Sequence, residues 1–110
     1  MAVSVSAPGP DEKTTETALT KLGDALLRQR GWIVKETTTA LNPKDGYPQR
    51  VYVKEGRMLF VEYLSAKGKP TKTQDEWRAQ LEKVEGSAGG VIEMLVIRPN
   101  NWDELRQAAR

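Results

Sequence analysis

Apolar residues recur at helical spacing in the first third of the chain, at Ala18, Leu19, Leu22, Leu26 and Leu27. Recurrence every three or four residues is typical of a helix that buries one face. Gly31 is a plausible stop signal, because glycine often follows the last residue of a helix. The pattern therefore predicts a helix from about Asp11 to Arg30.

Shorter apolar runs predict four strands. They are Trp32–Val34, Arg50–Lys54, Arg57–Leu64 and Val91–Ile97. The third is nearly continuous in apolar residues, which is typical of a central strand buried on both faces. The sequence Lys54-Glu55-Gly56-Arg57 predicts a tight turn, so the second and third strands should form a hairpin.

A second helix is predicted between the third and fourth strands. Its apolar stripe consists of Trp77, Leu81 and Val84. The helix should end near Gly86, and either of two residue pairs can form a capping box at its start. These pairs are Thr71 with Gln74 and Thr73 with Glu76.

A short last helix is predicted near the C-terminus. Asn101 with Glu104 can cap it, and it carries Trp102 and Leu105.

The predicted order of elements is helix, strand, strand, strand, helix, strand, helix. In a domain of this size, that order predicts an α/β fold with one mixed sheet flanked by helices. Residues 1–10 are small and turn-rich, so we expect a flexible tail followed by one domain over residues 11–110.

The composition narrows the possible chemistry. The 110 residues include no cysteine and no histidine, which excludes disulfides, histidine-ligated zinc, and Ser-His or Cys-His catalysis. Carboxylate-bound hard cations remain as the plausible metal chemistry. The net charge of +2 permits nucleic-acid binding without demanding it. Neither a membrane span nor a signal peptide is recognisable, so we expect a cytoplasmic protein.

Glu62 is conspicuous because it lies near the end of the predicted buried strand. A carboxylate buried there without a partner costs free energy, so a cation or a hydrogen-bond donor is expected beside it. An ordinary solvated strand end is the alternative, and the sequence leaves both interpretations open.

Five sequence features occur in a characteristic order. They are the helical acidic residue Glu16, the strand start Gly46-Tyr47-Pro48-Gln49, the strand end Phe60-Val61-Glu62-Tyr63-Leu64, the Gly-Lys-x-Thr-x-x-Gln-x-x-Trp run from Gly68 to Trp77, and Arg98-Pro99-Asn100-Asn101-Trp102. Together they resemble the VRR-NUC branch of the PD-(D/E)xK nuclease superfamily, whose small domains occur alone in phages and bacteria or attached to repair nucleases. The resemblance covers about Glu16 to Leu105. It implies a restriction-endonuclease-like core with the order helix-β-β-β-helix-β.

The resemblance also implies a Mg²⁺ or Mn²⁺ site, which this chain retains only in part. In the family, an Asp and a Glu on neighbouring strands bind the metal, and a Lys helps to position the attacking water. Glu62 matches the Glu, but Gln49 stands at the Asp position and Leu64 at the Lys position. Glu16 and Gln74 also match family positions, although a helix-dipole role and a capping role would explain them equally well. Loss of the two charged groups implies impaired catalysis.

Displaced residues offer a way to rebuild such a site. Asp45 lies four residues before Gln49 and is a candidate metal ligand together with Glu62 and Glu16. The candidates for the missing amine are Lys54, Lys67 and Lys69. Asp45 also fits an ordinary turn before glycine, and the lysines also fit a solvated surface.

Three functions therefore remain open. Lys67, Lys69 and Lys72 lie between the Glu62 strand and the second helix, which suits contacts with the phosphates of duplex or branched DNA. A protein-binding module, such as a phage inhibitor or accessory factor, is an alternative, because a scaffold freed from catalysis can change its surface. The third is an active metal-dependent DNA endonuclease with migrated residues. The stand-alone domains of this family are typically dimers, so the resemblance also implies a homodimer.

Overall fold

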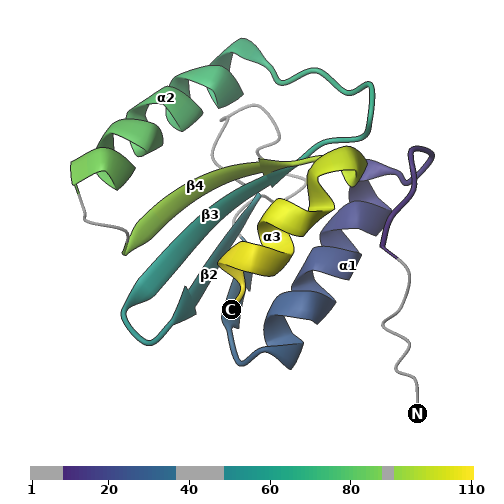
Figure 1. Cartoon of the computed structure of the whole chain (residues 1–110). Coiled ribbons are helices and arrows are strands. Elements are labelled where there is room, and N and C mark those ends of the chain that lie inside the picture. The colour runs from purple at the N-terminus through teal and green to yellow at the C-terminus, as the bar shows by residue number, and fades with distance from the viewer. Residues whose placement is uncertain (1–8, 37–48, 88–90) are drawn as a thin grey trace.

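The computed structural model describes residues 9–36, 49–87 and 91–110. Its elements are α1 (Glu16–Gln29), β1 (Ile33–Glu36), β2 (Arg50–Lys54), β3 (Arg57–Tyr63), α2 (Lys72–Ser87), β4 (Ile92–Ile97), the 3₁₀ turn η1 (Pro99–Asn101) and α3 (Trp102–Ala108) (Figure 1). The predicted order of elements is confirmed. None of the helices in these ranges has the length and apolar character needed to cross a lipid bilayer.

The first helix begins later than its sequence pattern suggested. Asp11 starts a separate turn, in which its carbonyl accepts from the Thr14 amide at 3.0 Å and its carboxylate accepts from the Lys13 amide at 2.8 Å. Thr15 then caps α1 by accepting from the Ala18 amide at 3.1 Å. The prediction of a start at Asp11 was wrong, because its side chain competes with helical hydrogen bonding.

The four strands form one mixed sheet in the order β1-β2-β3-β4. The first two pairings are antiparallel, and β3 pairs with β4 in parallel. The predicted turn joins β2 to β3, with positive φ at both Glu55 and Gly56, as tight hairpins with matching twist require. The α/β class with a mixed sheet flanked by helices is confirmed.

Helices cover both faces of the sheet (Figure 1). The face under α1 and α3 holds the larger core, which includes Leu19, Leu27, Trp32, Tyr52, Leu59, Val61, Tyr63, Ile97, Trp102 and Leu105. The face under α2 holds a smaller cluster of Val51, Phe60, Leu81 and Met94. The residues of β3 from Leu59 to Tyr63 are all buried, which confirms the prediction of a central strand.

One of the two possible capping boxes forms at the start of α2. Thr71 Oγ1 accepts from the Gln74 amide at 3.1 Å, and Gln74 Oε1 accepts from the Thr71 amide at 2.7 Å. The box predicted for Asn101 with Glu104 is wrong, since the Asn101 side chain makes no cap to α3. Asn101 instead accepts from the Arg98 amide at 2.6 Å, so it closes the preceding turn η1.

Candidate functional site

Glu62 is a buried carboxylate that has no hydrogen-bond partner among the described residues. Its side chain alternates with those of Val61 and Tyr63, which face α1 and α3, so it points with Phe60 toward the α2 layer. Only 2% of the residue is exposed. Within the described ranges, neither carboxylate oxygen has a hydrogen-bond partner. The interpretation as a solvated strand end is therefore wrong, and the carboxyl group is available to a proton or to a cation.

The surroundings of Glu62 bring the pKa of its carboxyl group close to neutral pH. Burial raises its pKa to about 7, because an ionised carboxylate is poorly solvated there. Arg78 opposes this rise, and Arg98 does so more weakly, whereas Asp75 and Glu16 add to it through like charge. The group is therefore poised to exchange a proton near neutral pH.

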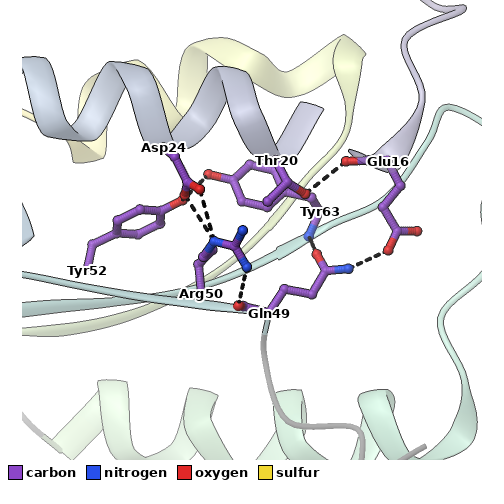
Figure 2. Close-up of polar contacts among 7 residues, drawn as sticks. All are labelled: Glu16, Thr20, Asp24, Gln49, Arg50, Tyr52 and Tyr63. Carbon is purple, nitrogen blue, oxygen red and sulfur yellow. Dashed lines mark hydrogen bonds and ion pairs between the residues drawn. The ribbon is translucent and has the colours of Figure 1, made fainter. Parts of the chain in front are cut away.

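Gln49 joins three parts of the site through its side-chain amide. Its Oε1 accepts from the Tyr63 amide on β3 at 2.8 Å, and its Nε2 donates to Glu16 Oε1 on α1 (Figure 2). The structure thus brings Gln49 and Glu16 together beside the end of the Glu62 strand. Both ends of the amide are already engaged, so its oxygen is not a free ligand.

A buried polar network supports the same end of the sheet, and sequence reasoning missed it. Arg50 Nε donates to both carboxylate oxygens of Asp24 at 3.1 Å. Tyr52 donates to Asp24 at 2.8 Å and lies 2.7 Å from the Tyr63 hydroxyl (Figure 2). Asp24 follows Glu16 and Thr20 at four-residue spacing, and this row of polar side chains on one helix face was the available signal.

This network has a structural role rather than an acid-base role. Burial is the main cause that raises the pKa of Tyr52 and of Tyr63 above that of an ordinary tyrosine. Both hydroxyls therefore stay protonated and serve as hydrogen-bond donors. The network fixes α1 against β2 and β3, which carry the residues of the candidate site.

Leu64 and Gln74, at two of the motif positions, have structural roles. Leu64 is only 3% exposed, and its amide donates to the Ile97 carbonyl at 3.0 Å, which continues the β3–β4 pairing. A leucine therefore stands where the resemblance would place a lysine. Gln74 is engaged in the capping box of α2, so the capping interpretation accounts for it.

The lysines differ in their relation to the site. Lys67 and Glu16 line the same cavity of about 570 Å³. Lys69, in the loop before α2, and Lys72, at the start of α2, are both exposed. Lys54 lies at the other end of β2 from Gln49, where it donates to the Arg30 carbonyl at 2.8 Å. It therefore does not replace the missing amine.

Arg98 holds the loop that carries Lys67 and Lys69. Nη1 of Arg98 lies 2.8 Å from the Ser65 carbonyl, 2.8 Å from that of Gly68 and 3.3 Å from that of Ala66. Gly68 also closes the turn by donating to Ser65 at 3.1 Å. The sequence pattern had included Arg98 in a motif without giving it a role.

The described residues do not fit a complete Mg²⁺ or Mn²⁺ site. Within the described part of the chain, no group of three or more acidic residues could hold a metal ion. Glu16 is engaged with Gln49, so among the described residues of the predicted set Glu62 is the carboxylate without a hydrogen-bond partner. The candidate ligand Asp45 lies outside the described residues.

Comparisons with known proteins add no relative. No protein-family model matches the chain, and neither curated proteins nor solved structures give a significant match. The function must therefore be inferred from the geometry of the site and from the sequence motifs.

Proposed function

We propose that this chain is a catalytically impaired nuclease-fold module of the VRR-NUC type that binds duplex or branched DNA through the phosphate backbone. Its support is the mixed sheet in which a hairpin, β2–β3, is followed by α2 and a parallel β4. This is the order that the resemblance implies. Glu62 and Gln49 then lie at matching ends of adjacent strands, as the metal-binding pair of the family would.

The chemistry of position 49 supports the loss of catalysis. A neutral amide engaged with Glu16 and Tyr63 adds no charge to hold a dication. Position 64 adds a buried leucine, which can neither position water nor offset charge on phosphate. Loss of one preorganised charged group typically slows a reaction about 100-fold to 1,000-fold, so loss of both should leave no measurable turnover.

The observation that supports DNA binding is the loop with Lys67 and Lys69, which lies beside the altered site. Arg98 draws the Ser65 and Gly68 carbonyls together, and Lys67 and Lys69 are exposed on this loop. Cations on a restrained loop suit phosphate contacts, which position a duplex without reading bases.

The test is a titration of labelled duplex and four-way-junction DNA at two salt concentrations. Binding should weaken with salt with a log-log slope of about 0.9 for each phosphate neutralised. Replacement of Lys67, Lys69 and Lys72 by Ala should weaken binding to every sequence and make that slope shallower by up to about three. Undetectable binding at low salt would eliminate the proposal.

A charge-matched variant controls for the change in net charge. Arg28, Lys35 and Lys83 are exposed on α1, β1 and the later part of α2. Their combined replacement by Ala removes the same charge, yet it should leave the salt slope close to that of the wild type.

A protein-binding module is the second candidate, and one surface feature favours it. Ile33 and Val53 are opposite each other in the β1–β2 register and are 72% and 37% exposed. Adjacent exposed apolar side chains are common at protein interfaces. This function predicts little DNA affinity at physiological salt and partner binding that depends on Ile33 and Val53 rather than on the lysines.

An active endonuclease with migrated residues is the third candidate. It requires a ligand and an amine from outside the predicted positions, such as Asp45 and Lys67. Incubation of duplex, flap and junction DNA with Mg²⁺ or Mn²⁺ distinguishes it. Cleavage that disappears on Glu62→Ala would replace the proposal of an impaired enzyme.

A further inference from the structure

Glu16 lines two cavities that otherwise share no residue. The first is the cavity of about 570 Å³ that Lys67 also lines. The second has a volume of about 380 Å³, and its lining consists of Glu16, Thr17, Thr20, Lys21, Gln49 and Arg50. The surface is therefore hollowed on both sides of Glu16, and the second cavity lies between α1 and the start of β2.

The guanidinium of Arg50 is fixed in the wall of the second cavity. Its Nε donates to both carboxylate oxygens of Asp24 at 3.1 Å, and its Nη1 donates to the Gln49 carbonyl at 3.0 Å (Figure 2). Its Nη2 donates to none of the described residues. Within the described ranges, the buried side-chain atoms without a partner are the two Glu62 oxygens, so Nη2 of Arg50 is accessible to solvent. Arg50 therefore presents a donor whose position is set before any ligand binds.

Two further donors come from α1. Thr17 and Lys21 are four residues apart, so they lie on the same face of the helix, one turn from each other. Both are exposed, and neither side chain bonds to a described residue. Thr20 differs from them, because its hydroxyl donates to the Glu16 carbonyl at 2.8 Å. The free donors of the cavity are thus a hydroxyl, an ammonium and one guanidinium N–H, which are the groups that proteins use to contact phosphate oxygens.

The charges in this cavity favour a ligand with a single negative charge. Asp24 balances the charge of Arg50, and Glu16 shares the lining with Lys21. Repulsion by Glu16 grows with the charge of the ligand. A phosphodiester, with one negative charge, is therefore preferred to a free phosphate ion, which is more highly charged at neutral pH.

We infer that the second cavity binds a phosphodiester of the DNA backbone through Lys21, Thr17 and Nη2 of Arg50, an inference that rests on the proposed DNA binding. Lys67 lines the first cavity, on the other side of Glu16. Phosphate contacts at both cavities make the DNA strand cross the altered site, whereas contacts at the lysine loop alone leave the strand to one side of it.

Titration of labelled duplex DNA over a series of salt concentrations tests the inference. Lys21→Ala should weaken binding and make the log-log slope shallower by about 0.9, the value for one phosphate. Thr17→Val removes a donor without a change in charge. It should weaken binding about twofold to tenfold, as the loss of one hydrogen bond does, and leave the slope unchanged.

Arg28→Ala is the matched control for Lys21→Ala. Arg28 is exposed seven residues later on the same face of α1, and it lines neither cavity. The variant removes the same charge from the same helix, so its salt slope should equal that of the wild type. An equal loss of slope in Arg28→Ala and Lys21→Ala would overturn the inference, because the overall charge of α1 would then explain both.

Amide chemical shifts distinguish a DNA strand from a free anion. Short duplex DNA should shift the amide resonances of Thr17 and Lys21 more than inorganic phosphate does at the same ionic strength. Equal or larger shifts with phosphate would overturn the inference. Wild-type protein that does not bind DNA at low salt would remove the proposed function and the inference together, whereas DNA binding with a slope unaffected by Lys21→Ala would overturn the inference alone.

Discussion

The side-chain amide of Gln49 donates a hydrogen bond to the carboxylate of Glu16, which lies 33 residues earlier on α1. A neutral donor therefore satisfies one acidic group of the site. An aspartate at position 49 would instead bring a second carboxylate toward Glu16, in the neighbourhood of Glu62. Such a cluster of like charges requires a cation, so the identity of residue 49 decides whether the site needs a metal.

Restoring both altered positions should create metal dependence. The double variant Gln49→Asp with Leu64→Lys should have a lower melting temperature than the wild type without metal, because it gathers carboxylates and buries an amine. Mn²⁺ should raise that temperature, since binding to the folded state stabilises it by about 2.7 kcal/mol at 100 times the dissociation constant. Differential scanning fluorimetry with and without Mn²⁺ measures the effect.

Adding Glu62→Ala to the double variant provides its control and should abolish the Mn²⁺ effect. If the double variant folds but its melting temperature does not change with Mn²⁺, positions 49, 62 and 64 do not form the metal site implied by the resemblance.

Glu62 should make the protein less stable as pH rises. Its pKa is raised from 4.5 to about 7 by burial, so its contribution to folding is complete below pH 4.5 and is lost as pH rises through 7. The loss amounts to about 3 kcal/mol. Urea unfolding of the wild type and of Glu62→Gln, near pH 4.5 and above pH 7, should show this decline only in the wild type. Equal pH dependence in the two proteins would contradict the burial of an unpaired carboxyl group.

Gly23 and Gly86 should respond oppositely to alanine. A Cβ at Gly23 would lie 1.9 Å from the buried Tyr63 hydroxyl, whereas one at Gly86 meets no neighbouring atom of the described residues within 4 Å. Gly23→Ala should therefore cost about 3 kcal/mol or more through overpacking. Gly86→Ala should stabilise α2 by up to about 1 kcal/mol. Denaturant unfolding compares the two, and a harmless Gly23→Ala would mean that α1 packs less closely on β3.

Arg98 should control the order of the lysine-bearing loop. Arg98→Ala removes the donor to Ser65 and Gly68, so the Gly68 amide should exchange with solvent at least about tenfold faster, and DNA affinity should fall. Arg98→Lys, with one ammonium instead of a planar fork, should be intermediate.

Arg106→Ala is the matched control, because it removes an equal charge from α3, where Arg106 pairs with the exposed Asp103. Unchanged exchange at Gly68 in Arg98→Ala would contradict a positioning role. Faster exchange without any loss of DNA affinity would retain that role but separate the loop from DNA binding.

Sequence patterns alone determined the order of the elements, because the signals for that order are local. The tight turn at Glu55-Gly56 needs only residues that accept positive φ, and the capping box of Thr71 with Gln74 involves residues three apart. Competition between nearby groups explains the errors at this level. Asp11 forms its own turn before α1, and Asn101 closes η1 instead of capping α3.

The state of the candidate site was decided only by tertiary structure. The sequence marked Glu62 and Gln49 but could not tell whether Glu62 was solvated, because that depends on the layer formed by α2. The Asp24–Arg50 pair joins residues 26 apart, and Arg98 reaches back 33 residues to Ser65. Such contacts form only when the helices and strands are packed together. Local preferences of the sequence for helix or strand say nothing about which distant side chains will meet.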